Sequence, residues 1–208
     1  VMRDVDELII LDISATPNRK KPKISIIEEQ AKFSTMPLTV GGGVKSTVDI
    51  MDLLKSGADK VSICSAAFEN PNLISNSAKL FGSQCITVGV DINKVEKNYF
   101  ISTNCGSFNH NLNIKDYFKK IQDLGAGEIL LNFVHKDGTK EGYDYEFLYK
   151  ISSVIKIPLI VAGGCGSYED MYKALKLDFI SAVAAGSIFY FTQMTPTDSR
   201  NFLNEKGI

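Results

Sequence analysis

The sequence has few cysteines, almost no net charge and no long apolar run, and each shortage excludes a class of protein. Its four cysteines, at positions 64, 85, 105 and 165, are too scattered for a zinc pattern and too few for a disulfide framework in 208 residues. The net charge of −1 and the pI near 6.2 give no attraction to nucleic acid or to an anionic membrane. The longest apolar runs have the length of strands, and Val1 opens no signal peptide. We therefore expect a cytoplasmic protein with reduced thiols, whose partner is a small molecule or another protein.

An apolar segment that ends in glycines occurs twice in the chain. Residues 37–43 read PLTVGGG, and residues 158–164, which lie 121 positions later, read PLIVAGG. The correspondence continues at the same offset, because Glu7 corresponds to Glu128 upstream. A duplicated unit of apolar strand, glycine turn and amphipathic helix predicts two half-domains built alike. Glycines at strand ends are also places where backbone N–H groups reach a phosphate.

Short apolar runs alternate with segments of helical spacing along the whole chain. Continuous apolar runs are typical of strands covered on both faces, and their regular alternation with helices indicates a parallel sheet. The predicted strands cover residues 7–12, 37–41, 59–64, 84–91, 127–133, 157–162 and 179–185. The predicted helices cover residues 24–34, 45–56, 70–80, 114–124, 143–155 and 167–176. A small hairpin near residues 94–102 interrupts the pattern, and no linker divides the chain.

The repeat and the number of units favour one barrel domain over an open sheet. An open doubly wound sheet could hold the seven visible strand-helix units, but two four-unit halves complete a closed (β/α)8 barrel. We therefore expect residues 1–208 to form a single, incomplete TIM-barrel domain that lacks its first strand-helix unit. The repeat places the counterpart of Asp91 roughly 30 residues before Val1. Because such a barrel exposes two unpaired strand edges, we expect the 208 residues alone to be inactive and poorly stable.

Polar residues and glycines follow the predicted strands at the ends that form the active-site rim of such barrels. Asp12 and Asp91 each close an apolar run. Glycines and hydroxyl residues recur in both halves, and two phosphate sites across one mouth would hold a substrate phosphorylated at both ends. These residues are Gly42, Gly43 and Ser65 in one half and Gly163, Gly164, Gly186 and Ser187 in the other.

A set of short segments in a fixed order gives a more specific signal than any single motif. The segments are DELIILDISAT (6–16), TVGGGV (39–44), GADKVSI (57–63), FGSQ (81–84), VD (90–91), GAGEILL (125–131) and DGTKEGYD (137–144). Through them, and over essentially its whole length, the chain resembles the cyclase subunit of imidazole glycerol phosphate synthase and the related HisF-like proteins.

The resemblance implies a (β/α)8 lyase that takes ammonia from a partner glutaminase. Cyclases of this family join the ammonia to a bis-phosphorylated ribulosyl-formimino-aminoimidazole carboxamide nucleotide. They release imidazole glycerol phosphate and an aminoimidazole carboxamide ribonucleotide, in histidine biosynthesis. The family uses two aspartates at opposite strand ends for proton transfer. Asp91 matches one of them, and the other belongs to the first strand, which is absent here. The resemblance also gives Asp12 a supporting role and adds Asp137 and Gly138 to the phosphate sites. No spacing implies a metal or an organic cofactor.

Three charged residues match the family's ring at the bottom of the barrel, where ammonia enters from the glutaminase. They are Glu7, Lys60 and Glu128, and the fourth member, an arginine of the first strand, is absent here. Charges inside an apolar wall are costly unless they pair, so Lys60 is a sensible neutralising partner for both glutamates. The residues alone, without the resemblance, favour a structural salt bridge.

Each candidate also has a purely structural interpretation. The two aspartates can form turns or cap helices, the paired glycines can serve tight turns that need positive φ, and Asp137-Gly138 is by itself a turn signal. The duplication of the glycines together with hydroxyl residues favours phosphate binding. Cys64 stands where the family usually has asparagine, and a thiol that only packs is the simpler interpretation.

The end of the fifth predicted strand departs from the family pattern and leaves the substrate open. His135 replaces an aspartate of the usual Asp-x-Asp-Gly-Thr stretch, and Asn132-Phe133 replaces smaller hydroxyl residues. A lone histidine on a loop is most often solvated, although it can titrate beside a substrate. Residues 184–196 resemble a HisF-like branch of surface-polysaccharide pathways, in which the ammonia helps to amidate a sugar, at least as well as histidine-pathway enzymes. A subunit that only docks and activates a glutaminase is a further alternative.

Overall fold

The computed structural model describes residues 5–18 and 20–208, and its centre is a curved parallel sheet. Neighbouring strands run parallel in the order β1-β2-β3-β4-β7-β8-β9. Their bounds are Leu8–Leu11 (β1), Leu38–Gly41 (β2), Lys60–Ile63 (β3), Ile86–Val95 (β4), Glu128–Phe133 (β7), Leu159–Ala162 (β8) and Ala182–Val183 (β9). The predicted strands are therefore confirmed in type and order, although the last is much shorter than predicted.

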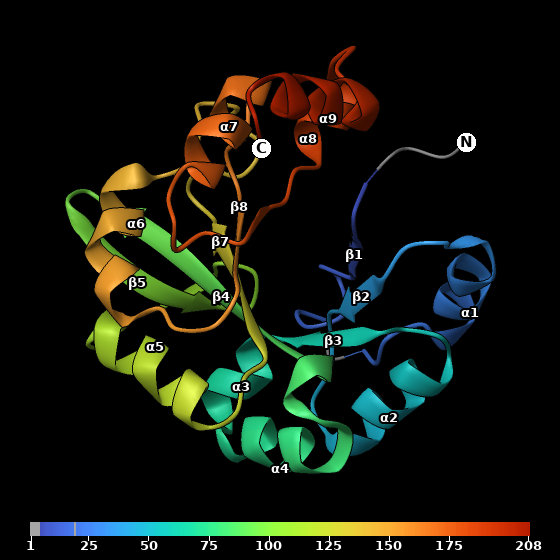
Figure 1. Ribbon diagram of the computed structural model, residues 1–208. Helices are drawn as coiled ribbons and strands as arrows, with labels where there is room; N and C mark the ends of the chain where they lie inside the picture. The colour runs from blue at the N-terminus through green and yellow to red at the C-terminus, as the bar shows by residue number, and fades with distance from the viewer. Residues whose placement is uncertain (1–4, 19) are drawn as a thin grey trace.

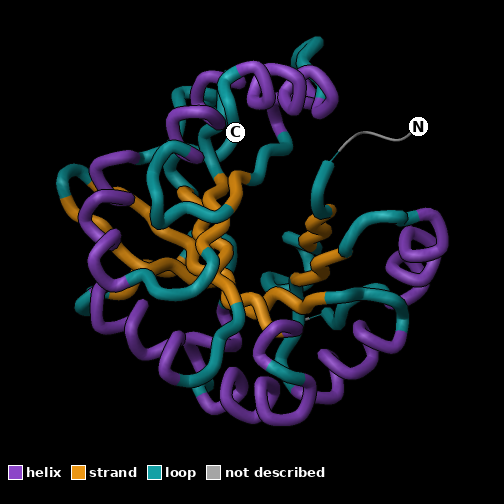
Figure 2. Tube along the Cα trace, in the orientation of Figure 1, coloured by secondary structure: helices purple, strands orange, loops and turns teal. Residues whose placement is uncertain are grey.

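Helices surround the outer face of this sheet (Figure 1). Their bounds are Ile24–Phe33 (α1), Thr47–Lys55 (α2), Ser65–Glu69 (α3), Asn72–Phe81 (α4), Ile114–Asp123 (α5), Tyr145–Ile151 (α6), Tyr168–Leu175 (α7), Ser187–Phe191 (α8) and Pro196–Glu205 (α9). Short 3-10 turns lie at Ser83–Cys85 and Ser152–Val154. With strands inside and helices outside (Figure 2), the architecture is that of a TIM barrel, as predicted. Within the described ranges, no helix is long and apolar enough to cross a membrane.

The barrel wall is open between β1 and β9. Among the described residues, β1 pairs only with β2, and β9 pairs only with β8. The sheet therefore curls part of the way around a barrel without closing (Figure 2). On the β1 side of the opening, Leu11 is 46% exposed and Ile13 is 74% exposed. The described part of the chain is thus the incomplete barrel that the number of strand-helix units predicts.

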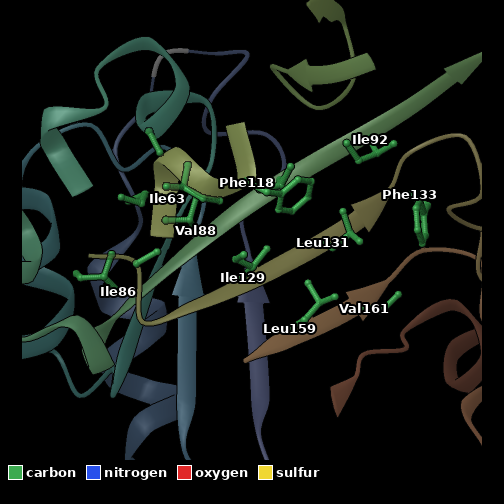
Figure 3. Close-up of a cluster of buried hydrophobic side chains, with 14 of the residues drawn as sticks. Ile63, Ile86, Val88, Ile92, Phe118, Ile129, Leu131, Phe133, Leu159 and Val161 are labelled. Atoms are coloured by element: carbon green, nitrogen blue, oxygen red, sulfur yellow. The ribbon is translucent and has the colours of Figure 1, made fainter. Parts of the chain in front are cut away.

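Side chains alternate between the two faces of each strand, which separates the apolar layer from the barrel interior. On β7 the odd-numbered residues 129–133 are fully buried, and the ring of Phe133 lies 5.7 Å from that of Phe147 on α6. They belong to the layer between sheet and helices, part of which Figure 3 shows. The alternate residues Glu128 and Asn132 face inward, where they bind polar side chains of β4.

The internal repeat is visible in the caps of α2 and α7. Ser46 precedes α2 and Ser167 precedes α7, and each hydroxyl oxygen accepts a hydrogen bond of 3.2 Å from the backbone N–H three residues later. The acceptor side chains of Asp49 and Asp170 bind back to these hydroxyls at 2.9 Å in both halves. The same reciprocal cap therefore sets the start of the helix that follows each glycine turn.

The arm after β4 is longer than the predicted hairpin. Strand β4 pairs antiparallel with β5 (Asn98–Thr103), which pairs with β6 (Phe108–His110). Ile92 and Ile101 are register partners and both are buried, so apolar side chains stabilise the pairing of β4 with β5. The polar sequence of the turn between these strands does not predict a pairing of this length. Helices α8 and α9 lie beyond the predicted elements, and α9 begins at a proline after its cap Thr195, a common way to start a helix.

Candidate active site

Strand register brings the predicted rim residues to one end of the barrel. In a parallel sheet the carboxyl ends of neighbouring strands share one edge, which is where barrel active sites lie. The hydrogen bond from the Asp12 N–H to the Gly41 carbonyl, at 3.0 Å, continues the pairing of β1 with β2 past the end of β1. Register pairs at or next to this edge are Leu11–Gly41, Ile63–Val88, Asp91–Asn132 and Asn132–Ala162.

Asp91 is partly buried at this rim and has two side-chain partners. Its Oδ1 accepts a hydrogen bond of 3.2 Å from Asn132 Nδ2, and its Oδ2 lies 3.8 Å from the Cys64 sulfur. Burial raises the pKa of Asp91 by more than these two hydrogen bonds lower it, and the charge of Asp137 raises it further. A carboxyl group whose pKa moves toward neutrality is suited to transfer protons.

Asp12 has a different environment although it also follows a strand. Its Oδ1 accepts hydrogen bonds from Ser14 N at 2.9 Å, from Ser14 Oγ at 2.7 Å and from Ala15 N at 3.1 Å. The hydroxyl bond from Ser14 is the main reason why the pKa of Asp12 lies below its ordinary value. This carboxylate therefore forms the turn after β1, and its supporting role in catalysis stays a prediction.

The two glycine turns are close copies of each other. Residues 42–43 have φ of +99° and +73°, and residues 163–164 have φ of +85° and +105°, a region that favours glycine. A Cβ at Gly42 would lie 2.3 Å from the Asp12 carbonyl oxygen, and one at Gly163 would lie 2.6 Å from the Phe133 carbonyl oxygen. Each turn thus packs against the end of a neighbouring strand, so the fold itself requires these glycines. Their role in phosphate binding stays a prediction.

The other predicted phosphate residues are less alike in the two halves. Ser65 opens α3, and its Oγ accepts a hydrogen bond of 2.9 Å from Asn104 N in the β5–β6 turn. Ser187 opens α8, after Gly186. Asp137 and Gly138 lie in an exposed turn after β7. A Cβ added at Gly138 or Gly186 would meet nothing within 4 Å, so both glycines border open space.

A charged ring lies at the opposite end of the interior, where the strands begin. Lys60 Nζ donates to Glu7 Oε2 at 2.8 Å and to Glu128 Oε2 at 2.9 Å. Thr87 donates its hydroxyl to Glu128 at 2.6 Å, and Thr39 donates its hydroxyl to Glu7. Burial lowers the pKa of Lys60, but the hydrogen bonds and charges of the two glutamates raise it by more, so Lys60 stays charged. The predicted contact of Lys60 with both glutamates is confirmed; the role of the ring as an ammonia gate stays a prediction.

The two threonines of the ring are absent from the sequence-based candidates. They occupy equivalent places in LTVG (38–41) and ITVG (86–89), each as the one polar residue before a glycine. That repeated pattern is the signal that would have found them. With Thr39 and Thr87 included, the residue before β1 and the strands β2, β3, β4 and β7 contribute Glu, Thr, Lys, Thr and Glu in order.

The expectation that His135 is solvated is wrong. Its side chain is only 15% exposed, and its Nε2 lies 3.1 Å from Asp144 Oδ2. Its Nδ1 lies 3.4 Å from the Ile92 carbonyl oxygen. Asp144 also caps α6 by accepting the Phe147 N–H at 3.0 Å, so one carboxylate ties the loop after β7 to the next helix. This partner is nine residues away in sequence, and no spacing rule for a lone histidine predicts it.

The Cys64 side chain contacts the Asp91 carboxylate as well as packing. Burial, followed by the nearby charge of Asp91, raises the pKa of the Cys64 thiol well above its ordinary value. It therefore remains a thiol and is a weak donor toward the Asp91 carboxylate. The interpretation of Cys64 as a packed thiol is incomplete, because the side chain also contacts the candidate catalytic carboxylate.

Fold and site together define the class: a TIM-barrel protein with a partly buried carboxyl group at the carboxyl ends of its strands and a charged ring at their amino ends. The family model described as histidine biosynthesis protein matches residues 2–195. The chain therefore belongs to the histidine biosynthesis protein family.

Within this family the chain is similar to HisF subunits. It is 41% identical over 203 residues to the imidazole glycerol phosphate synthase subunit HisF of Natranaerobius thermophilus, an alignment that covers 98% of this chain and 81% of that protein. It is 43% identical over 204 residues to the subunit of the same name from Dictyoglomus thermophilum, with the same coverage. Identity to the subunit from Saccharolobus solfataricus is 40% over 203 residues, again 98% of this chain and 81% of the relative.

Proposed function

We propose that this chain belongs to the cyclase subunit of an imidazole glycerol phosphate synthase. In this role it takes ammonia from a partner glutaminase and joins it to a bis-phosphorylated formimino-aminoimidazole carboxamide ribulonucleotide. The products are imidazole glycerol phosphate and an aminoimidazole carboxamide ribonucleotide. The observation that carries the proposal is the partly buried Asp91, with its raised pKa, in the same barrel interior as the ring of Glu7, Lys60 and Glu128.

The inward positions between the ring and Asp91 support a route for ammonia. Lys60 at the start of β3 and Cys64 just after its end both face inward, because one contacts the glutamates and the other contacts Asp91. The inward positions between them on β2, β3 and β4 are therefore Gly41, Ser62 and Gly89. A Cβ at Gly41 would lie 2.9 Å from the Ser62 Cβ, so only glycine fits beside this serine. In our proposal, ammonia enters at the ring and passes these small residues to reach Asp91.

The glycine turns of the two halves are proposed to hold the two phosphates of the substrate. Backbone N–H groups of turns with positive φ are a common anion cradle. Gly42, Gly43 and Ser65 form one set, and Gly163, Gly164, Gly186 and Ser187 form the other, with Asp137 and Gly138 at the edge of the second. Both sets follow strands at the same rim, so a substrate bound between them would lie over Asp91.

The test measures imidazole product from the protein as its gene encodes it. With the bis-phosphorylated substrate and an ammonium salt we expect turnover, and with glutamine we expect turnover only when the glutaminase is present. The 208-residue chain alone should be inactive, because β1 and β9 leave the sheet open over the described residues. No product from the encoded protein at high ammonium concentration would contradict the cyclase assignment.

One observation favours a second candidate, which is ammonia delivery for the amidation of a sugar in surface-polysaccharide synthesis. His135 stands where the resemblance expects an aspartate, and its Nε2 is turned toward Asp144. That position therefore supplies no carboxyl group to the rim. An encoded protein that activates its glutaminase yet forms no imidazole product would support this second candidate, or a subunit that only docks the glutaminase.

A further inference from the structure

A second concave site lies outside the barrel, between the β4–β6 arm and helices α5 and α6. Its volume is about 450 Å³, within the range of small-molecule sites. Figure 1 shows the arm beside these two helices, away from the open edge of the sheet. None of its lining residues belongs to the rim or to the charged ring.

The lining of this pocket is positively charged. It includes Lys97 from the arm, Lys115 from α5 and Lys150 from α6, and no carboxylate. Among residues 5–18 and 20–208, none of the salt bridges uses any of these three lysines. Three ammonium groups from separate segments, converging on one pocket in a chain with net charge −1, favour an anionic ligand.

An aromatic side chain is held in place at the same pocket. The Tyr99 hydroxyl lies 3.0 Å from both carboxylate oxygens of Asp144 and accepts a hydrogen bond of 2.9 Å from Lys94. Its ring packs 5.0 Å from the ring of Phe147, and Lys150 Nζ lies 5.4 Å from the Tyr99 centroid. Burial is the main cause that raises the pKa of Tyr99 to about 12, so the phenol stays neutral. A ring that is already fixed loses little entropy when a planar ligand stacks on it.

Three asparagines add neutral hydrogen-bonding groups to the charged and aromatic side chains of the pocket. Asn98, Asn111 and Asn113 line it and offer amide donors and acceptors for a heterocycle or a sugar hydroxyl. We propose that this pocket binds a phosphorylated small molecule that carries a planar heterocycle, of the size of a nucleoside monophosphate. The phosphate lies among Lys97, Lys115 and Lys150, and the heterocycle lies on Tyr99.

The test is isothermal titration of the protein as its gene encodes it with AMP, inorganic phosphate and adenosine as separate probes. We expect AMP to bind saturably at this pocket, and the other two probes to bind at least about tenfold more weakly, because each lacks one half of the recognised groups. No saturable binding of AMP at millimolar concentration would overturn the proposal.

Paired variants then assign the site. Lys97→Gln with Lys115→Gln removes two exposed charges and should weaken AMP binding by about 10- to 100-fold. The matched control is Lys119→Gln with Lys120→Gln, which changes the charge equally on exposed positions of α5 outside the lining and should leave affinity unchanged. Circular dichroism checks that both double variants fold. Unchanged affinity in the first variant, or an equal loss in the control, would place AMP elsewhere and overturn the proposal.

Discussion

Asp12 and Asp91 lie at the same edge of the sheet and have opposite surroundings. Asp12 comes directly after β1 and Asp91 lies within β4, both at the carboxyl edge of the sheet. The hydrogen bond from Ser14 is the main cause that lowers the pKa of Asp12, and burial is the main cause that raises the pKa of Asp91. A place on the rim therefore does not by itself make a carboxylate catalytic; its neighbours decide its chemistry.

The position of each strand in the sheet explains the difference. Strand β1 has one described partner, and Leu11 beside Asp12 is 46% exposed. Strand β4 lies between β3 and β7, and it also pairs with β5, which places Ser102 opposite Asp91. More neighbours mean more desolvation, which favours the neutral form of a carboxyl group.

The largest expected difference between the two aspartates is in catalysis. Asp91→Asn keeps the shape of the side chain but removes the proton-transfer group, so kcat should fall by about 10²- to 10⁴-fold. Asp12→Asn should reduce kcat by less than about tenfold, because the amide oxygen of asparagine can still accept hydrogen bonds in the turn that Asp12 forms. Steady-state kinetics of the encoded protein with ammonium salts measure both. Equal losses would show that the two aspartates do not differ in role.

The next largest effect is on stability: the Asp91→Asn variant, which loses activity, should be more stable than the parent. A carboxyl group whose folded pKa is raised costs stability as the pH rises from its unfolded pKa through its folded pKa. Asp91→Asn should therefore increase the free energy of unfolding at pH 7 by about 1 kcal/mol, since it removes the cost of a partly buried charge. The gain should shrink as the pH falls toward 3.8, the ordinary pKa of aspartate. Urea unfolding of the variant and the parent at pH 7 and pH 5 measures this gain. A gain that is smaller at pH 7 than at pH 5 would contradict the prediction.

A pair of variants at the neighbours sharpens the comparison further. The hydrogen bond from Asn132 lowers the pKa of Asp91, so Asn132→Leu should raise that pKa and move the acid limb of the pH–rate profile to higher pH. Ser14→Ala removes the main hydrogen bond to Asp12 and should leave the pH–rate profile unchanged. Profiles that shift equally in both variants would contradict the assignment of proton transfer to Asp91.

The smallest expected effect is the structural contribution of Asp12. Asp12→Ala removes the acceptor of three hydrogen bonds in the turn and should cost about 0.5 kcal/mol at pH 7, a low value because the residue is only partly buried. Because the folded pKa is lowered, this contribution is present above the unfolded pKa and is lost as the pH falls through the folded pKa. Thermal unfolding at pH 7 measures it, and a gain in stability would contradict it.

The fold is accessible from the sequence because it depends on repeated local patterns, namely apolar runs that alternate with helical segments and the 121-residue offset. The offset also relates Glu7 to Glu128, but the family resemblance, and not the repeat, adds Lys60 to the ring. The difference between Asp12 and Asp91 is not accessible in this way, since both close similar apolar runs. It depends on which strand lies at the edge of the sheet and on the arm that folds over β4.

Contacts between distant segments account for the other residues that the sequence does not predict. The carboxylate of Asp144, the cap of α6, contacts His135 in the loop after β7 and Tyr99 in the arm. Thr39 and Thr87 share a local sequence pattern, but their role in the ring is clear only once their glutamate acceptors are known. Local chemistry thus predicts the elements, and tertiary packing decides which polar side chains meet.

The most direct test of the account is the titration of the two carboxyl groups by ¹³C NMR of the folded protein. The Asp91→Asn and Asp12→Asn variants assign the two signals. The account predicts a midpoint above the ordinary value of 3.8 for Asp91 and a midpoint below 3.8 for Asp12. A midpoint for Asp91 at or below 3.8, or at or below that of Asp12, would contradict the claim that Asp91 is the desolvated proton-transfer group of this barrel.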